Sequence, residues 1–154
     1  AGQFFPRILL SRIGTEFVER FDKQKGIADA RRVAARVAAG DSALFFPEGT
    51  CQRMPGLLPF QMGAFVTAAE SGVPVVPITI RGTRTILRPD TWLPRRGVIS
   101  VVIEAPIEPD AGEDPTTTGT WTRAAKLRDA ARRRILERCG EPDLGHERGF
   151  AQSP

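Results

Sequence analysis

One carboxylate in this chain stands where an apolar run gives way to a loop. Glu48 is the centre of the segment Phe46–Thr50 (FPEGT), which follows the short apolar run at residues 43–46. Open α/β sheets usually hold their ligands at such strand ends, and the flanking proline and glycine make the loop stiff and sharply turned. We therefore interpret Glu48 as a hydrogen-bonding site residue, with Thr50 supplying a hydroxyl beside it. The alternative is an ordinary turn that carries a solvent-exposed glutamate.

Three further blocks surround this segment in a fixed order. Before it lies Ile13–Arg20 (IGTEFVER), and after it come Leu57–Phe65 (LLPFQMGAF) and Val73–Ile78 (VPVVPI). Together with FPEGT, these blocks resemble the 1-acylglycerol-3-phosphate acyltransferase family, the lysophosphatidate acyltransferases and their relatives. The resemblance covers residues 3–109 and depends on the four blocks in order, since any one of them alone is weak.

The resemblance implies an O-acyltransferase of phospholipid biosynthesis. Such an enzyme moves a fatty acyl group from acyl-CoA or acyl-carrier protein to the hydroxyl of a lysophospholipid such as 1-acylglycerol-3-phosphate. The reaction needs a general base, an anion site for the acceptor phosphate and donors for the developing oxyanion, with no metal and no bound cofactor. The alternative is a non-catalytic lipid- or phosphate-binding module that uses the same pocket without chemistry.

The resemblance also implies which residues bind substrate. They are Arg20, Glu48, Gly49, Thr50, Arg53 and Pro77. Arg20 would hold the acceptor phosphate through its planar fork of donors, and Glu48 would accept a hydrogen bond from a glycerol hydroxyl. Pro77 would shape the acyl or acceptor pocket.

The chain departs from the family pattern where positive charge is usual. Cys51 and Gln52 stand where the family has Arg-Ser, and Gln61 stands where Lys is frequent. Arg53 would replace the first charge through a loop shift; otherwise the acceptor is another lyso-lipid or an acylated amine lipid. A nucleophilic role for Cys51 would need a base within reach, and no histidine lies near it in sequence.

The catalytic base of the family is missing from this chain. In the family it is the His of a His-x-x-x-x-Asp motif, which precedes the four blocks. The only histidine here is His146, in a polar, glycine-flanked stretch with no Asp four or five residues beyond it. We expect His146 to be an exposed tail residue, no catalytic residue to lie within the 154 residues, and the chain to be a fragment whose base lies upstream and which is inactive alone.

Composition limits the other classes of function. The chain has 154 residues, 41% of them hydrophobic and 26% charged, with a net charge of +4, which fits one globular domain. The basic excess suits phosphate-bearing ligands or an anionic membrane surface, whereas nucleic-acid signatures are lacking. We expect a protein at the cytoplasmic face of a membrane, peripheral or anchored through a preceding segment. Two cysteines without CxxC spacing predict neither disulfides nor a metal site.

The pattern of elements that must position these residues is that of an α/β fold. Apolar periodicity predicts helices at residues 28–39, 60–70 and 121–139, a strand at residues 14–20, and buried strands at residues 43–46, 73–80 and 98–104. This alternation is typical of a mostly parallel mixed sheet flanked by helices. The predicted organisation is an acyltransferase domain at residues 1–109 (its C-terminal two-thirds), a loop and basic helix at residues 110–139, and a flexible tail at residues 140–154.

Overall fold

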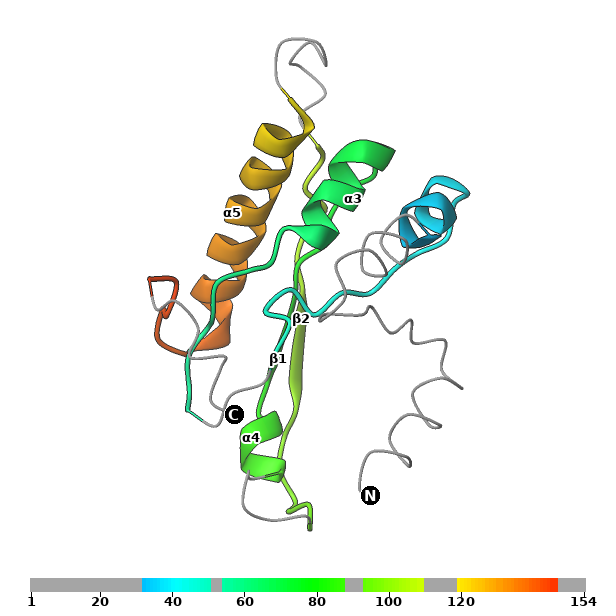
Figure 1. Ribbon diagram of the computed structural model, residues 1–154. Coiled ribbons are helices and arrows are strands. Elements are labelled where there is room, and N and C mark those ends of the chain that lie inside the picture. The colour runs from blue at the N-terminus through cyan, green and yellow to red at the C-terminus, as the bar shows by residue number, and fades with distance from the viewer. Residues whose placement is uncertain (1–31, 51–53, 88–92, 110–118, 147–154) are drawn as a thin grey trace, which may run out of the picture.

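The computed structural model describes four stretches of the chain, residues 32–50, 54–87, 93–109 and 119–146 (Figure 1). Some of the predicted features fall outside these stretches: the strand at residues 14–20 and the side chains of Arg20, Cys51 and Arg53. Residues 32–38 are helical, as predicted for part of residues 28–39, and Val33 and Val37 are the buried positions of that helix.

Helix α3 (Gly63–Ser71) forms from the run of small and apolar residues predicted to be helical. It ends at Gly72, which adopts the left-handed conformation (φ 66°) and donates its N–H to the carbonyl of Ala68. Only glycine takes this conformation without steric cost. The predicted helix and its end near residue 70 are therefore both confirmed, with the start three residues later than expected.

Helix α5 (Thr120–Cys139) matches the predicted C-terminal helix and ends at a second left-handed glycine, Gly140. Apolar spacing predicts that Trp121, Ala124, Ala125, Ala131 and Ile135 share the apolar side of this helix, and the structure agrees only in part. Ala124, Leu127 and Ala131 are buried, whereas Trp121 is 65% exposed. Alanines and Leu127 line the interface with α3.

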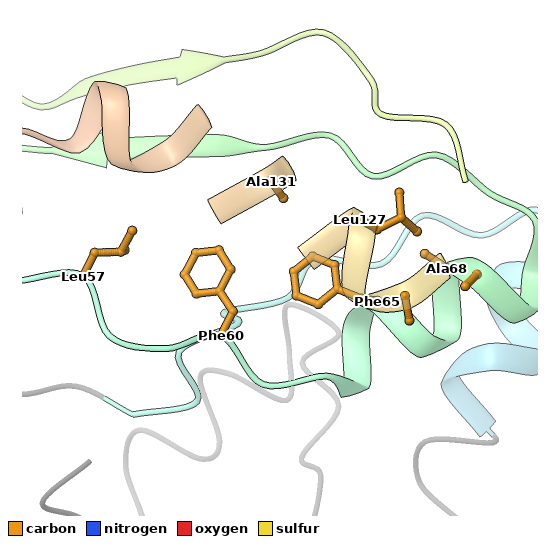
Figure 2. Packing of buried hydrophobic residues seen from close by; sticks show 8 residues of the cluster. Leu57, Phe60, Phe65, Ala68, Leu127 and Ala131 are labelled. Carbon is orange, nitrogen blue, oxygen red and sulfur yellow. The ribbon is translucent and has the colours of Figure 1, made fainter. Parts of the chain in front are cut away.

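The core lies between α3 and α5, with the Leu57–Phe60 segment extending it toward the C-terminal end of α5 (Figures 1 and 2). The Phe60 and Phe65 rings stack, with centroids 6.2 Å apart. The buried members of this cluster are Leu57, Phe60, Phe65, Ala68, Ala69, Ala124, Leu127 and Ala131. Because half of them are alanines, the two helix backbones can approach closely.

Strands β1 (Ile78–Arg81) and β2 (Ser100–Ile103) form a two-stranded antiparallel ribbon, in which Ile78 pairs with Ile103 and Ile80 with Val101. In the described part of the connection between them, residues 82–87 and 93–99, the one helix is the short α4 (Thr83–Ile86). A parallel pair needs a crossover helix long enough to span the sheet, and α4 is not. The α/β class is supported. The β1–β2 pair is antiparallel, so a mostly parallel sheet is not seen in the described residues and stays a prediction.

The expected burial of the strands is wrong for one face of this ribbon. Thr79 on the α5 side is 2% exposed, whereas Ile80 and Val101 on the other side are 49% and 54% exposed. Residues 43–46, predicted as a buried strand, are extended but exposed, and no ladder to them is present in the described part of the chain. A strand becomes buried only when neighbours cover both its faces, and the described residues do not cover these.

The first residues beyond α5 pair with the segment around Leu57. Leu57 N–H donates to the Pro142 carbonyl at 2.9 Å, and Leu144 N–H donates to the Leu57 carbonyl at 3.1 Å. Leu57 and Asp143 form an isolated parallel bridge. Polar, glycine-containing composition does not reveal this backbone pairing to a distant segment, and a flexible tail at residues 140–154 stays a prediction.

Candidate functional site

The FPEGT segment folds into a tight turn. Gly49 N–H donates to the Phe46 carbonyl at 3.0 Å, and Gly49 has φ +69°, a conformation that other residues rarely adopt. Glu48 lies at the second central position of this turn and is half-buried. The sharp turn predicted for this loop is therefore present, and its glutamate is partly buried.

This turn is joined to the LLPF segment that follows ten residues later. The Gln61 N–H donates to the Pro47 carbonyl at 2.7 Å. The Leu58 N–H donates to Glu48 Oε2 at 3.0 Å. Two of the blocks on which the family resemblance depends thus form one hydrogen-bonded unit. A carboxylate has about four lone-pair sites, so Glu48 keeps acceptor capacity for a ligand hydroxyl.

The other side of the LLPF segment is held by Arg132 of α5. Its Nη2 donates to the Leu57 carbonyl at 2.9 Å, and its Nε lies 3.4 Å from the Leu58 carbonyl. The guanidinium also sits 5.9 Å from the centroid of the Phe60 ring, within the range of a cation–π contact. The Arg132 side chain therefore binds the LLPF segment through two backbone carbonyls and through the Phe60 ring.

Arg132 is in turn paired with Asp143. Arg132 Nη2 and Asp143 Oδ1 are 2.5 Å apart, and the arginine side chain is only 16% exposed. The hydrogen bond from Arg132, together with one from the Gly145 N–H, lowers the pKa of Asp143 from 3.8 to about 2. The carboxylate is ionised at neutral pH, so the pair is intact there.

Glu141 links the loop before Leu57 to the arginine-containing connection between β1 and β2. Its Oε2 accepts from the Gly56 N–H at 2.6 Å, and its Oε1 pairs with Arg84 Nε at 3.0 Å. The Arg-rich connection between β1 and β2 thus contributes at least one structural ion pair. Arg84 supports the loop before Leu57 through this carboxylate.

The remaining predicted site residues are spread out. Thr50 is exposed at the end of the turn, and Pro77 is buried immediately before β1. The Pro77 carbonyl accepts from the Glu104 N–H at 3.0 Å, and the described residues show no hydrogen bond between Pro77 and the Glu48 turn. The structure thus brings Glu48 and Gly49 together with the LLPF segment, while Arg20 and Arg53 lie outside the described residues.

Other groups with potential chemistry lie apart from this turn. His146 is exposed, as predicted, near Asp143. Cys139 is a half-buried free thiol whose S–H is directed at the Leu136 carbonyl. In the stretches that the structure describes, no cluster of three His, Cys, Asp or Glu side chains is arranged for a metal ion. The helices in those stretches are also too short or too polar to cross a membrane.

Sequence reasoning missed Arg132, Asp143 and Glu141. The helical pattern of residues 121–139 predicts Arg132 on the polar side of the helix, although the residue directly follows the buried Ala131 and so borders the packed face. This position beside a buried residue is the sequence feature that could have indicated a partly buried role for Arg132. The partners were not predictable, because the Leu57 carbonyl is 75 positions away in the chain and a backbone acceptor has no side-chain signature.

Comparisons with known proteins agree with the blocks described above. A family model described as Acyltransferase matches residues 3–81, which include the FPEGT, LLPF and VPVVP segments. The chain is 35% identical over 129 residues to a chloroplastic 1-acyl-sn-glycerol-3-phosphate acyltransferase of Brassica napus, covering 83% of this chain and 34% of the relative. It is 34% identical over 119 residues to the 1-acyl-sn-glycerol-3-phosphate acyltransferase of Saccharomyces cerevisiae, covering 75% of this chain and 38% of the relative.

The fold also has a counterpart of known structure. The crystal structure of the 1-acyl-sn-glycerophosphate (LPA) acyltransferase from Thermotoga maritima superposes with a TM-score of 0.58 at 23% identity, over 73% of this chain and 45% of that one. At this identity the likeness concerns the fold. The chain spans between a quarter and two-fifths of the length of the first curated relatives it matches.

Proposed function

Because the chain belongs to the acyltransferase family, we propose that the protein is an O-acyltransferase of phospholipid biosynthesis. It moves a fatty acyl group from an acyl-CoA or acyl-carrier-protein thioester to the hydroxyl of a lysophospholipid such as 1-acylglycerol-3-phosphate. The observation that carries the proposal is the hydrogen-bonded unit of the Glu48 turn and the LLPF segment. It makes a half-buried carboxylate part of a rigid loop inside the region that the family model matches.

In this proposal Glu48 orients the acceptor. Its carboxylate accepts from a glycerol hydroxyl while Oε2 remains bound to the Leu58 N–H. Thr50 offers a hydroxyl at the exposed end of the turn, and Pro77 shapes the acyl or acceptor pocket. Arg20 and Arg53 bind the acceptor phosphate, because a guanidinium matches phosphate with paired donors.

The general base is not one of the described groups around Glu48. We assign it to a histidine, oriented by an aspartate, outside these 154 residues, because the single histidine here is the exposed His146. The base removes the proton of the acceptor hydroxyl, whose oxygen attacks the thioester carbonyl; the thiolate of the donor then leaves and takes up the proton. Activity is therefore proposed for the product of the complete reading frame that contains this chain.

We also propose that the protein works at the cytoplasmic face of a membrane, where its lipid acceptor resides. The net charge of +4 favours an anionic surface. The order of helices and strands along the chain favours a sheet that is mostly parallel outside the β1–β2 ribbon.

The test is acyl transfer by the complete reading frame product. Radiolabelled acyl-CoA and acyl-carrier protein are each offered with lysophosphatidate, and phosphatidate formation is followed. Transfer by the wild-type protein and loss of most of it in Glu48→Ala and in Arg20→Ala support the proposal. Wild-type turnover in both variants would refute these site assignments.

The second candidate is a lipid- or phosphate-binding module without chemistry. The observation that favours it is the position of His146, exposed and outside the Glu48 turn. It predicts that the protein sediments with lysophosphatidate-containing liposomes in a salt-dependent way, yet forms no phosphatidate. Failure to bind such liposomes at low salt would rule this candidate out.

A further inference from the structure

A single peptide group connects Glu48 with α5. The peptide that joins Leu57 to Leu58 donates its N–H to Glu48 Oε2 at 3.0 Å. Its carbonyl accepts from Arg132 Nη2 at 2.9 Å and from the Leu144 N–H at 3.1 Å. The one N–H of this peptide is bound by the Glu48 carboxylate. Both lone pairs of its carbonyl are bound, one by the Arg132 guanidinium and one by the Leu144 N–H.

Arg132 is itself fixed, which distinguishes it from an ordinary surface arginine. Its side chain is 16% exposed and is paired with Asp143. It also lies over the Phe60 ring, whose other neighbour is the stacked Phe65 of the core. A long side chain held in this way loses little further entropy when it holds a carbonyl, so its hydrogen bonds are geometrically defined.

The charge of Arg132 has an effect beyond geometry. A cation at the carbonyl end of a peptide polarises the group and strengthens its N–H as a donor, because hydrogen bonds in series reinforce one another. The donor strengthened here is the Leu58 N–H, which holds Glu48. Without Arg132 the carbonyl would lose a charged donor, and the Leu57–Leu58 peptide would be freer to rotate away from the carboxylate.

We propose that Arg132 is a positioning residue that sets the orientation of the Glu48 carboxylate through the Leu57–Leu58 peptide. The proposal rests on the function proposed above, in which Glu48 orients the lysophospholipid acceptor. It makes α5, which lies outside the residues matched by the family model, a determinant of acceptor binding. Asp143 supports the same arrangement by holding the guanidinium.

The test compares steady-state kinetics of the complete reading frame product and its variants with lysophosphatidate and acyl-CoA. Arg132→Met removes the charge and the donors, and Arg132→Lys keeps the charge without the planar fork. Arg132→Met is expected to raise the KM for lysophosphatidate about tenfold and to leave the KM for acyl-CoA unchanged. Arg132→Lys should recover part of the loss. Arg138→Met, which removes an exposed ion pair with Glu104 on the same helix, is the matched control and should behave as wild type.

Two readouts separate positioning from general stability. Amide hydrogen exchange of peptides covering residues 56–61 should accelerate in Arg132→Met while that of α3 does not change. The double variant Glu48→Ala/Arg132→Met should be no worse than Glu48→Ala alone, since Arg132 acts through Glu48. If Arg132→Met does not fold, Asp143→Asn and Arg132→Lys carry the same comparison.

The outcomes are distinct. An unchanged KM for lysophosphatidate in Arg132→Met beside an impaired Glu48→Ala would overturn the positioning role and leave the proposed function standing. Additive losses in the double variant would also overturn it. Absence of acyl transfer in the wild type, or full activity in Glu48→Ala, would overturn the proposed function itself.

Discussion

Gly49 lies so close to Gln61 that a Cβ on Gly49 would come within 3.3 Å of the Gln61 Cγ atom. The turn that carries Glu48 thus packs closely against Gln61, the residue after the LLPF segment, and is also hydrogen-bonded to it. At φ +69° Gly49 also occupies a region that disfavours side chains. The left-handed backbone favours glycine at this position, and a Cβ would in addition require the Gln61 side chain to shift by a few tenths of an ångström.

The Gly49→Ala variant should be destabilised by about 1–2 kcal/mol, because an L side chain is strained in the left-handed region. Denaturant unfolding of the complete reading frame product measures the change. Gly63→Ala is the matched control: Gly63 begins α3, and a Cβ added there would have no neighbouring atom within 4 Å, so alanine should be neutral or mildly stabilising. Equal effects of the two substitutions would contradict the account of the turn.

The α3–α5 interface should not tolerate larger side chains. Ala124 is 0% exposed between the two helices, so Ala124→Leu should cost about 1–3 kcal/mol through overpacking. Ala38→Leu, at an exposed helical position, should stay within about 0.5 kcal/mol of wild type. Thermal unfolding of both variants gives the comparison, and a neutral Ala124→Leu would show that the helices do not pack as described.

Stability should depend on the ionisation of Asp143. Its pKa falls from 3.8 to about 2 in the folded protein because of Arg132 and the Gly145 N–H. The folded state therefore binds fewer protons than the unfolded state between these values, so the stabilisation is complete above pH about 4 and disappears as the pH falls toward 2. Unfolding measured across this window should be less pH-dependent in Asp143→Asn. In Arg132→Met the pKa of Asp143, followed by NMR, should rise; a value still near 2 would remove Arg132 as the cause.

The uncovered face of the ribbon should make this chain self-associate when it is produced by itself. Ile80 and Val101 pair across the ribbon and are about half exposed, and exposed apolar strands favour association. Light scattering after gel filtration should show oligomers of the 154-residue chain. Replacement of both residues by Thr should shift the distribution toward monomer, and a wild-type chain that is monomeric at high concentration would contradict this expectation.

The features that local sequence predicted well are the helix ends and the Glu48 turn. Gly72 and Gly140 end α3 and α5 because a left-handed cap is decided by one residue and its neighbours. The FPEGT turn is likewise local, since its bond runs from Gly49 to Phe46. The position of Glu48 as a constrained carboxylate could therefore be inferred from the sequence alone.

The pairing of distant segments could not be inferred in this way. Two examples join residues far apart in the chain: the antiparallel pairing of Ile80 with Val101, and the hydrogen bond from Arg132 to the Leu57 carbonyl. Such contacts depend on which surfaces meet in the folded chain. The sequence around an arginine on a helix does not indicate which backbone carbonyl the arginine will bind. For the same reason, the pairing of residues 142–144 with Leu57 could not be inferred from the sequence.

The central claim is that the Glu48 turn binds the acceptor of an O-acyltransferase. The most direct measurement is kcat/KM for acyl transfer to lysophosphatidate by the complete reading frame product, wild type against Glu48→Ala, with circular dichroism to show that both are folded. Loss of a charged hydrogen-bonding group predicts a decrease of about 10- to 100-fold. A folded Glu48→Ala protein with the wild-type kcat/KM would contradict the account.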